Sequence, residues 1–352
     1  MRSLVLGDVE SIIRDGAFFR GRFTTEFEQA LAHWFGDRAA TCVGNGTDAL
    51  YLALAAVEIG TGDRVATVAN AGGYSTNAIL RCGAHPTFID IDPVTAQMSS
   101  GGLSDALAND RSIRAVVATH LYGLVGEISA IREACNDASV WLIEDCAQSF
   151  GAEVNGVPAG TFGQLATCSF YPTKNLGAFG DAGAVVSSTP ELDARVRSLA
   201  QYGWQSRYEI TVAGGINSRI DEIQAAILLR GMELVDDQNR RRREIALRYH
   251  ASLTGGRRLI ATDDERYVAH LAILITDSRH ADAQSLELAG IGTGIHYPIA
   301  DHRQPAWTGV GDACELVATD FLQPRILTLP CFPTMTDGEV DRVAAALAAL
   351  PG

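Results

Sequence analysis

Lys174 is the residue whose type and setting point most directly to chemistry. The chain has 28 lysines and arginines, and Lys174, within SFYPTKNLGAFGDAG, is the one lysine among them. A lysine amine can lose its proton and attack a carbonyl to form a Schiff base, whereas an arginine stays protonated. The surrounding proline and glycines favour a tight loop close to a ligand. We therefore predict a nucleophilic amine here, the alternative being a surface lysine in an arginine-rich chain.

A second candidate site is GNGTDA, residues 44–49, between a short strand-like run and an apolar helix. Its G-x-G-x-x-A spacing matches a dinucleotide-binding turn. It equally suits a single phosphate, held by amides at a helix N-terminus together with the Thr47 hydroxyl. A plain turn and helix cap is the alternative without function.

Further polar residues follow strand-like runs. Asp145 and Gln148 follow VWLIE, and a carboxylate at the carboxyl end of a parallel strand could hold a heterocyclic nitrogen protonated. Asp145 could instead only cap the next segment, and His120 in HLYG is more simply a structural histidine. In GGINSRIDEIQAA, Asn217 could donate to a phosphate or make the turn. The sequence has no GxSxG or HExxH motif, and its histidines lack metal-ligand spacing.

These residues need a scaffold, and the hydrophobic pattern predicts an α/β fold. Apolar runs at 64–69, 86–92, 113–123 and 140–145 alternate with helical segments, which predicts a mainly parallel sheet between helices. Further predictions are a first helix from TTEFEQALAHWF, capped by Thr25 and Glu28, a strand at TGIHYP and a terminal helix from Asp337. A long polar helix near residue 235 suggests a large domain at 1–235 and a smaller α+β domain at 236–352. Its arginines 240–243 are expected on a solvated face pairing with acids, the alternative being a phosphate site.

Composition excludes several classes of function. The net charge of −14 argues against nucleic acid or an anionic membrane as a partner. Seven cysteines without a CxxC pair indicate a reducing compartment, so we expect a cytoplasmic protein. No apolar run has membrane-spanning length, and the N-terminus lacks a signal-peptide pattern.

Six stretches occur in order over roughly residues 20–348: GTDAL, HLYG, IEDCAQSFGA, SFYPTKNLGAFGDAG, GINSRIDEIQAA and GIGTGIHYP. Together they resemble the DegT/DnrJ/EryC1/StrS family of sugar aminotransferases, which are pyridoxal 5'-phosphate enzymes of fold type I. The resemblance implies that Lys174 binds the cofactor as a Schiff base, that Asp145 pairs with its ring nitrogen and that Gln148 lies near its ring. It also implies a homodimer, in which Asn217 reaches the cofactor phosphate of the neighbouring subunit.

Other implied residues complete the site. The cofactor phosphate would be held by Ser169, Thr47 and the backbone around Gly46 and Asp48. Similar proteins place an aromatic residue on the cofactor ring after the strand matching RVATVA, but this chain reads NAGGYST, so Tyr74 is the stacking candidate. Candidates for sugar contacts, mostly by position, are Tyr171, Trp204, His296 and Tyr297.

The resulting prediction is transfer of an amino group from glutamate or glutamine to C3 or C4 of a nucleotide-linked keto-deoxysugar, in two half-reactions. A related dehydratase has histidine at the lysine position, so Lys174 argues against it. Alternatives are a ketocyclitol acceptor, a nicotinamide-dependent oxidoreductase suggested by the G-x-G-x-x-A spacing, and a non-catalytic regulatory member.

Overall fold

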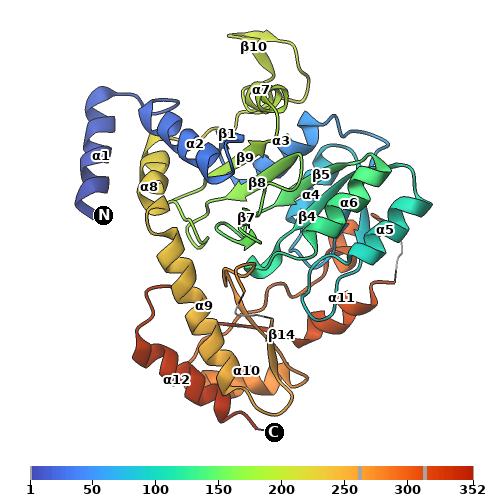
Figure 1. The fold of residues 1–352 in the computed structure, drawn as a ribbon, viewed down its shortest axis with the longest axis vertical. Helices are drawn as coiled ribbons and strands as arrows, with labels where there is room; N and C mark the ends of the chain where they lie inside the picture. The colour runs from blue at the N-terminus through green and yellow to red at the C-terminus, as the bar shows by residue number, and fades with distance from the viewer. Residues whose placement is uncertain (1, 261–263, 312–314, 352) are drawn as a thin grey trace.

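The protein is built on two β-sheets joined by a long helix (Figure 1). The computed structural model describes residues 2–260, 264–311 and 315–351. A seven-stranded sheet forms from the first part of the chain and a three-stranded antiparallel sheet from the last part. The helix between them, α9 (Val235–Ser252), begins where the sequence predicted a domain boundary, and the division itself stays a prediction.

The seven-stranded sheet is parallel except for one strand. Its order is β1-β9-β8-β5-β4-β2-β3, and β9 runs antiparallel to both of its neighbours. The parallel strands all end at one edge, so polar residues that follow them gather there. Its strands are β1 (Ala39–Val43), β2 (Arg64–Val68), β3 (His85–Ile89), β4 (Ile113–Thr119), β5 (Trp141–Asp145), β8 (Leu165–Ser169) and β9 (Gly183–Ser187).

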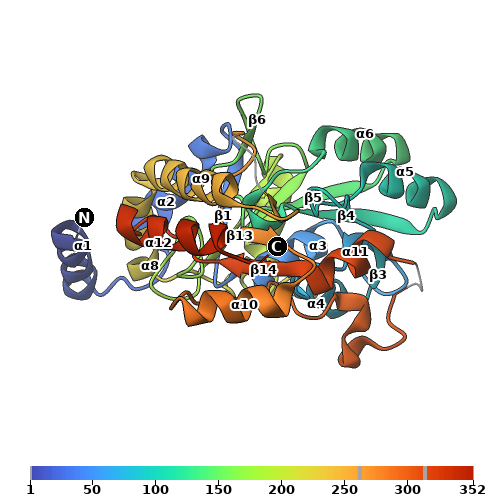
Figure 2. The same ribbon diagram turned by 90° about the horizontal axis from the view of Figure 1, so that it is seen from below.

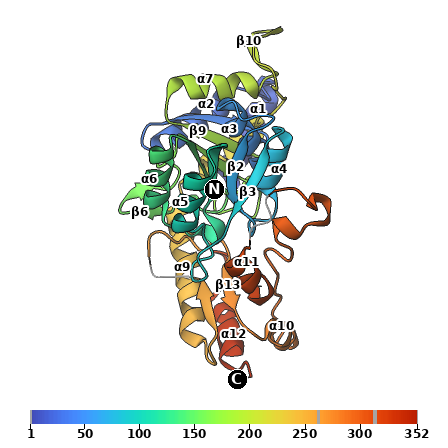
Figure 3. The same cartoon turned by 90° about the vertical axis from the view of Figure 1, so that its right-hand side faces the viewer.

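Neighbouring side chains on each strand point to opposite faces of this sheet. Both faces are apolar, so helices cover both of them. Val65 and Val117 pack into the core beneath α3, α4 and α7, whereas Ala66 and Val116 pack into the core on the other face. Figure 3 shows α5 and α6 on one side of β2 and β3 and α4 on the other. The helices of this part are α1 (Arg2–Asp15), α2 (Arg22–Trp34), α3 (Gly46–Ala56), α4 (Tyr74–Arg81), α5 (Ser100–Asn109), α6 (Ile128–Ala138), α7 (Pro190–Leu199) and α8 (Glu222–Met232).

The smaller sheet lies at the other end of the molecule from α7 (Figure 1), and α9, α10 and α12 surround it (Figure 2). Its central strand β13 pairs with β12 and β14. Its elements are β12 (Arg258–Ile260), β13 (Ala272–Ile275), β14 (Ile326–Leu329), α10 (Arg279–Leu288), α11 (Val317–Leu322) and α12 (Asp337–Ala348). Short elements elsewhere are the pairs β6 (Glu153–Val154) with β7 (Val157–Pro158) and β10 (Trp204–Ser206) with β11 (Glu209–Ile210), and 3-10 turns at 121–123, 301–303, 305–307 and 323–325.

Two predictions of local structure were wrong. The first residues form α1, and α2 begins at Arg22, so Thr25 and Glu28 lie inside a helix rather than capping it. TGIHYP forms one bridge, Gly294 to Thr328, instead of a strand. The long polar helix is confirmed as α9, which starts at Val235 after α8 ends at Met232. None of the helices in the described part of the chain is long and apolar enough to cross a membrane.

Candidate active site

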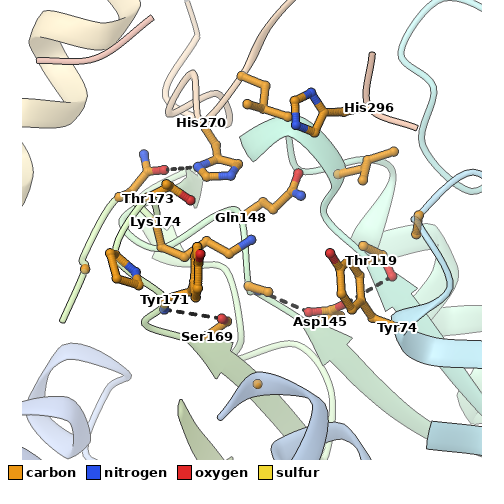
Figure 4. A pocket seen from close by; sticks show the side chains of 18 of the residues that line it. Tyr74, Thr119, Asp145, Gln148, Ser169, Tyr171, Thr173, Lys174, His270 and His296 are labelled. Atoms are coloured by element: carbon orange, nitrogen blue, oxygen red, sulfur yellow. Dashed lines mark hydrogen bonds between the residues drawn. The ribbon is translucent and has the colours of Figure 1, made fainter. Parts of the chain in front are cut away.

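A cavity of about 1020 Å³ opens at the carboxyl ends of the parallel strands. Its walls come from loops of the large sheet and from segments near residues 270, 296 and 332 that belong to the C-terminal part (Figure 4). This volume suits a cofactor-sized ligand together with a substrate. Of the residues predicted from the sequence, those that line it are Gly46, Thr47, Tyr74, Asp145, Gln148, Ser169, Tyr171, Lys174, His296 and Tyr297.

Lys174 lies in the predicted tight loop. Its backbone N–H donates to the carbonyl of Tyr171 at 2.8 Å, and a Cβ at Gly177 would come within 2.7 Å of the Pro172 carbonyl oxygen. The side chain points into the cavity, as Figure 4 shows. Burial lowers the pKa of the Lys174 amine, and the Asp145 carboxylate works against this shift. The cavity thus increases the share of neutral, nucleophilic amine.

Asp145 faces the same cavity from the end of β5 and is 5% exposed. One carboxylate oxygen accepts the backbone N–H of Ala147 at 3.1 Å, while the other makes only a long contact, 3.4 Å, with the Thr119 hydroxyl. Burial raises the pKa of this carboxyl group, and the Ala147 N–H and the Lys174 amine oppose that rise. A protonated ring nitrogen would give the second oxygen a charged donor.

The start of α3 forms a cradle beside Ser169. A Cβ on Gly46 would lie 2.6 Å from the Ser169 Cβ, so only glycine permits this close approach. The backbone N–H of Asp48 is already used, because it donates to the capping Asn45 side chain at 2.8 Å. The side chain of Asp48 turns away to Arg81 at 2.9 Å. The N–H groups at the helix start and the hydroxyls of Thr47 and Ser169 suit a phosphate, but Asp48 itself does not line the cavity.

Another part of the cavity wall is a cluster of polar and aromatic side chains. Gln148 accepts the backbone N–H of Tyr122 at 2.7 Å and donates to the Tyr297 hydroxyl at 3.1 Å. Tyr74 is the first residue of α4, is 47% exposed, and has its ring 6.1 Å from that of Tyr297. Gly72 and Gly73 both have positive φ, and a Cβ on Gly72 would meet the Tyr297 ring at 2.8 Å. This explains why NAGGYST has two glycines; stacking of Tyr74 on a cofactor stays a prediction.

Besides Asp48, two predicted residues do not reach the cavity of their own chain. Trp204 lies in the β10–β11 hairpin, which extends away from the sheet in Figure 1, and it packs against Tyr202 and Tyr208. Asn217 is exposed and pairs through its backbone with Gln201. His120 has a structural environment: its ring contacts Glu144 at 3.0 Å, and Glu144 also accepts backbone N–H groups of residues 160, 162 and 163.

Sequence reasoning missed a hydrogen-bonded chain next to Lys174, formed by Asn175, Asn239 and His270. Asn239 donates to the Phe150 carbonyl at 3.0 Å, so its oxygen faces Asn175, which donates to it at 2.7 Å and to the Val268 carbonyl at 3.0 Å. The Asn175 oxygen therefore faces His270 Nδ1, 2.9 Å away. Since carbonyls only accept, His270 must carry its proton on Nδ1 and leaves Nε2 as an acceptor.

The arginine run 240–243 divides between two environments. Arg240 and Arg241 pair with Asp237 at 2.6 Å and Asp337 at 2.8 Å, which confirms the prediction of a surface face for these two. For Arg242 that prediction was wrong, because the side chain is 6% exposed and lines the cavity. No local sequence signal distinguishes it from its neighbours.

Comparison with known proteins identifies the family. Residues 2–348 match the model of the DegT/DnrJ/EryC1/StrS aminotransferase family. The chain belongs to this family. Its aminotransferase activity and its pyridoxal phosphate cofactor, both predicted from the sequence, follow from that membership, and so does the fold class. The nicotinamide-dependent oxidoreductase is thereby not supported.

Individual relatives cover nearly the whole chain. It is 33% identical over 350 residues to UDP-N-acetyl-3-dehydro-alpha-D-glucosamine 3-aminotransferase of Acidithiobacillus ferrooxidans, covering 99% of this chain and 94% of that protein. It is 35% identical to dTDP-3-amino-3,4,6-trideoxy-alpha-D-glucose transaminase of Micromonospora megalomicea subsp. nigra, over 98% of this chain and 94% of the relative. The crystal structure of S. venezuelae DesV with a ketimine intermediate superposes with a TM-score of 0.94 at 32% identity, covering 99% of this chain and 94% of DesV.

The residues present fit pyridoxal phosphate. The cavity contains the Lys174 amine, whose pKa is lowered, and the buried Asp145 carboxylate, one of whose oxygens makes only a long hydrogen bond. It also contains the start of α3, where Gly46 packs closely against Ser169. These are the donors and acceptors that an aldehyde, a ring nitrogen and a phosphate require. We predict that Lys174 binds the aldehyde, Asp145 the ring nitrogen and the Gly46–Ser169 cradle the phosphate.

Proposed function

We propose that the protein aminates C3 of a nucleotide-linked 3-keto sugar, with glutamate or glutamine as the amino donor. The observation that carries the reaction type is the placement of the Lys174 amine and the Asp145 carboxylate in one cavity. Support for the sugar carbon comes from the two relatives above, whose names both place the amino group at C3. Their nucleotides differ, so the base is left open.

Several polar groups of the cavity have a defined task in this proposal. Pyridoxal phosphate supplies an electron sink that stabilises negative charge on the carbon losing its proton. Asp145 would accept a hydrogen bond from the ring nitrogen and keep it protonated. Lys174 Nζ, with its lowered pKa, accepts the proton that leaves the α-carbon of the donor. Tyr171, His296 and Tyr297 line the cavity, and we propose that they contact the sugar.

We also propose that the working unit is a homodimer with shared active sites in a cytoplasmic enzyme. Asn217 is exposed and lies away from the cavity of its own chain, which supports a role at the cavity of a second copy. The exposed hairpin carrying Trp204 could contact the partner's substrate in the same way.

A panel of acceptors tests the proposed substrate. Enzyme converted to its aminated form with glutamate is incubated with dTDP- and UDP-linked 3-keto and 4-keto sugars and with a ketocyclitol, and products are identified by mass spectrometry. Amination of a nucleotide 3-keto sugar in preference to the others supports the proposal. Preferred amination of a 4-keto sugar or of the ketocyclitol would replace it.

A further inference from the structure

Arg242 is a buried cation that lines the active-site cavity. It extends from α9 and is 6% exposed. One terminal nitrogen, Nη1, donates to the carbonyl oxygens of Cys331 at 2.7 Å and His270 at 3.3 Å. These bonds orient the guanidinium group and leave its positive charge without an anionic partner.

Within the described residues no carboxylate pairs with Arg242, and its Nε has no hydrogen-bond partner. The chain treats another buried arginine differently: Arg257, with a side chain of 5% exposure, forms two hydrogen bonds with Asp282 at 2.7 and 2.8 Å. Burying a charge is costly unless a counter-charge accompanies it. Arg242 therefore has the environment of an anion-binding site, in which the ligand supplies the negative charge that the protein does not.

One donor of Arg242 is left for a ligand. Nη1 is engaged with carbonyls and Nε is fully buried, so Nη2 is the guanidinium nitrogen that an anion in the cavity can approach. Its neighbour His270 stays neutral, because burial and the nearby charges of Lys174 and Arg242 hold its pKa well below the usual value. The hydrogen bond from Arg242 to the His270 carbonyl places Arg242 beside the chain of hydrogen bonds that ends at Asn175, next to Lys174.

We propose that Arg242 binds a carboxylate of the amino-acid donor. This inference rests on the proposed aminotransferase reaction, and it assigns a subsite for the first substrate rather than for the sugar. It predicts that the two half-reactions depend differently on Arg242, since a keto sugar without a carboxylate has no group for this site.

The test compares donors with and without each carboxylate. In single turnovers, amination of the bound cofactor is followed by its absorbance for glutamate, its α-amide and its γ-amide, using wild type, Arg242→Met and the matched control Arg240→Met on the same helix. We expect Arg242→Met to lower kcat/KM for glutamate at least about 30-fold, and to abolish the preference for glutamate over one of the two amides. Reaction of the aminated enzyme with a keto sugar should change less than about threefold.

An equal loss for glutamate and both amides, or an equal loss in both half-reactions, would show that Arg242 is only structural and would overturn the proposal. If Arg242→Met does not fold, Arg242→Lys serves, since it keeps the positive charge but its shorter side chain withdraws the donor from the cavity. As a readout independent of turnover, calorimetry should show glutarate binding to wild type and Arg240→Met but at least about tenfold weaker to the Arg242 variant. Failure of glutamate to aminate even wild type, with glutarate binding intact, would count against the proposed donor and not against the subsite.

Discussion

At the scale of single residues, Lys174 gives the sharpest test of the site. If its amine bonds to the aldehyde of pyridoxal phosphate, borohydride should make the link permanent and add one cofactor per chain. The only other primary amine in the sequence is the N-terminus, so the label should appear solely on the peptide containing YPTKNLG. Peptide mass spectrometry measures this directly. Label mainly on Met1 would remove Lys174 from its assigned role.

Asp301 predicts an unusual pH dependence of stability. Its side chain lies in the core and is 1% exposed. One carboxylate oxygen accepts a hydrogen bond from the Thr76 hydroxyl at 2.5 Å, and the other has no hydrogen-bond partner. Burial raises the pKa of this carboxyl group to about 7. Between pH 4 and 7 the folded state keeps a proton that the unfolded state loses, so this group makes stability fall as pH rises through that window. Asp301→Asn should remove the penalty, raising the free energy of unfolding by about 2–3 kcal/mol more at pH 8 than at pH 5.

Urea denaturation of both proteins at the two pH values measures this difference, with Asp277→Asn, whose side chain is 85% exposed, as a control. A pH-independent difference would mean that Asp301 is ionised in the folded protein.

Sequence reasoning named residues that line the cavity where a residue type was unusual in its sequence context. Lys174 was identifiable because it is unique, and Asp145 because it ends an apolar strand. Arg242 and His270 carry no such signal, because their burial at the cavity is decided by how α9 and the segment before β13 pack against the large sheet. Asp48 was predicted from its motif, but its side chain is diverted to Arg81.

At the scale of elements, α2 depends on a cap supplied from another helix. Glu222, at the start of α8 and 2% exposed, accepts the backbone N–H groups of Gly21 at 2.9 Å, Phe23 at 2.8 Å and Thr24 at 3.0 Å. Glu222→Ala leaves these buried donors unsatisfied, so it should lower the free energy of unfolding by about 3 kcal/mol. Denaturant titration against Glu233→Ala, whose carboxylate is exposed at the end of α8, checks the expectation.

A loss of less than about 0.5 kcal/mol in Glu222→Ala would show that water replaces the carboxylate at this helix start.

The same contact between Glu222 and the start of α2 explains why the sequence predicted the wrong helix boundary. Thr25 and Glu28 have capping-box spacing, but the cap comes from a residue about 200 positions away, which no local pattern reveals. The strand predicted at TGIHYP does not form, because a strand needs a partner along its length and only Gly294 has one.

At the scale of the whole molecule, the proposed shared site predicts complementation between inactive variants. A mixed dimer of Lys174→Ala and Asn217→Ala subunits contains one cavity with both residues intact. Random reassociation makes about half of the dimers mixed, so about a quarter of wild-type activity should return. Activity after mild dissociation and remixing is measured against each variant treated alone. Mixed dimers that form and remain inactive would contradict the shared site.

The parallel sheet was predictable because its strands are continuous apolar runs separated by helical segments. The arrangement of the smaller sheet beside the cavity was not, since its contacts to the large sheet join residues far apart in sequence. The chain of Asn175, Asn239 and His270 is one of these contacts.

That chain has a consequence for redesign of the enzyme. Its direction is fixed by the main-chain acceptors of Phe150 and Val268, so an aspartate at position 175 or 239 would place acceptor against acceptor. Libraries that aim to change the accepted sugar should therefore keep both asparagines constant and vary the exposed rim around Tyr171 instead.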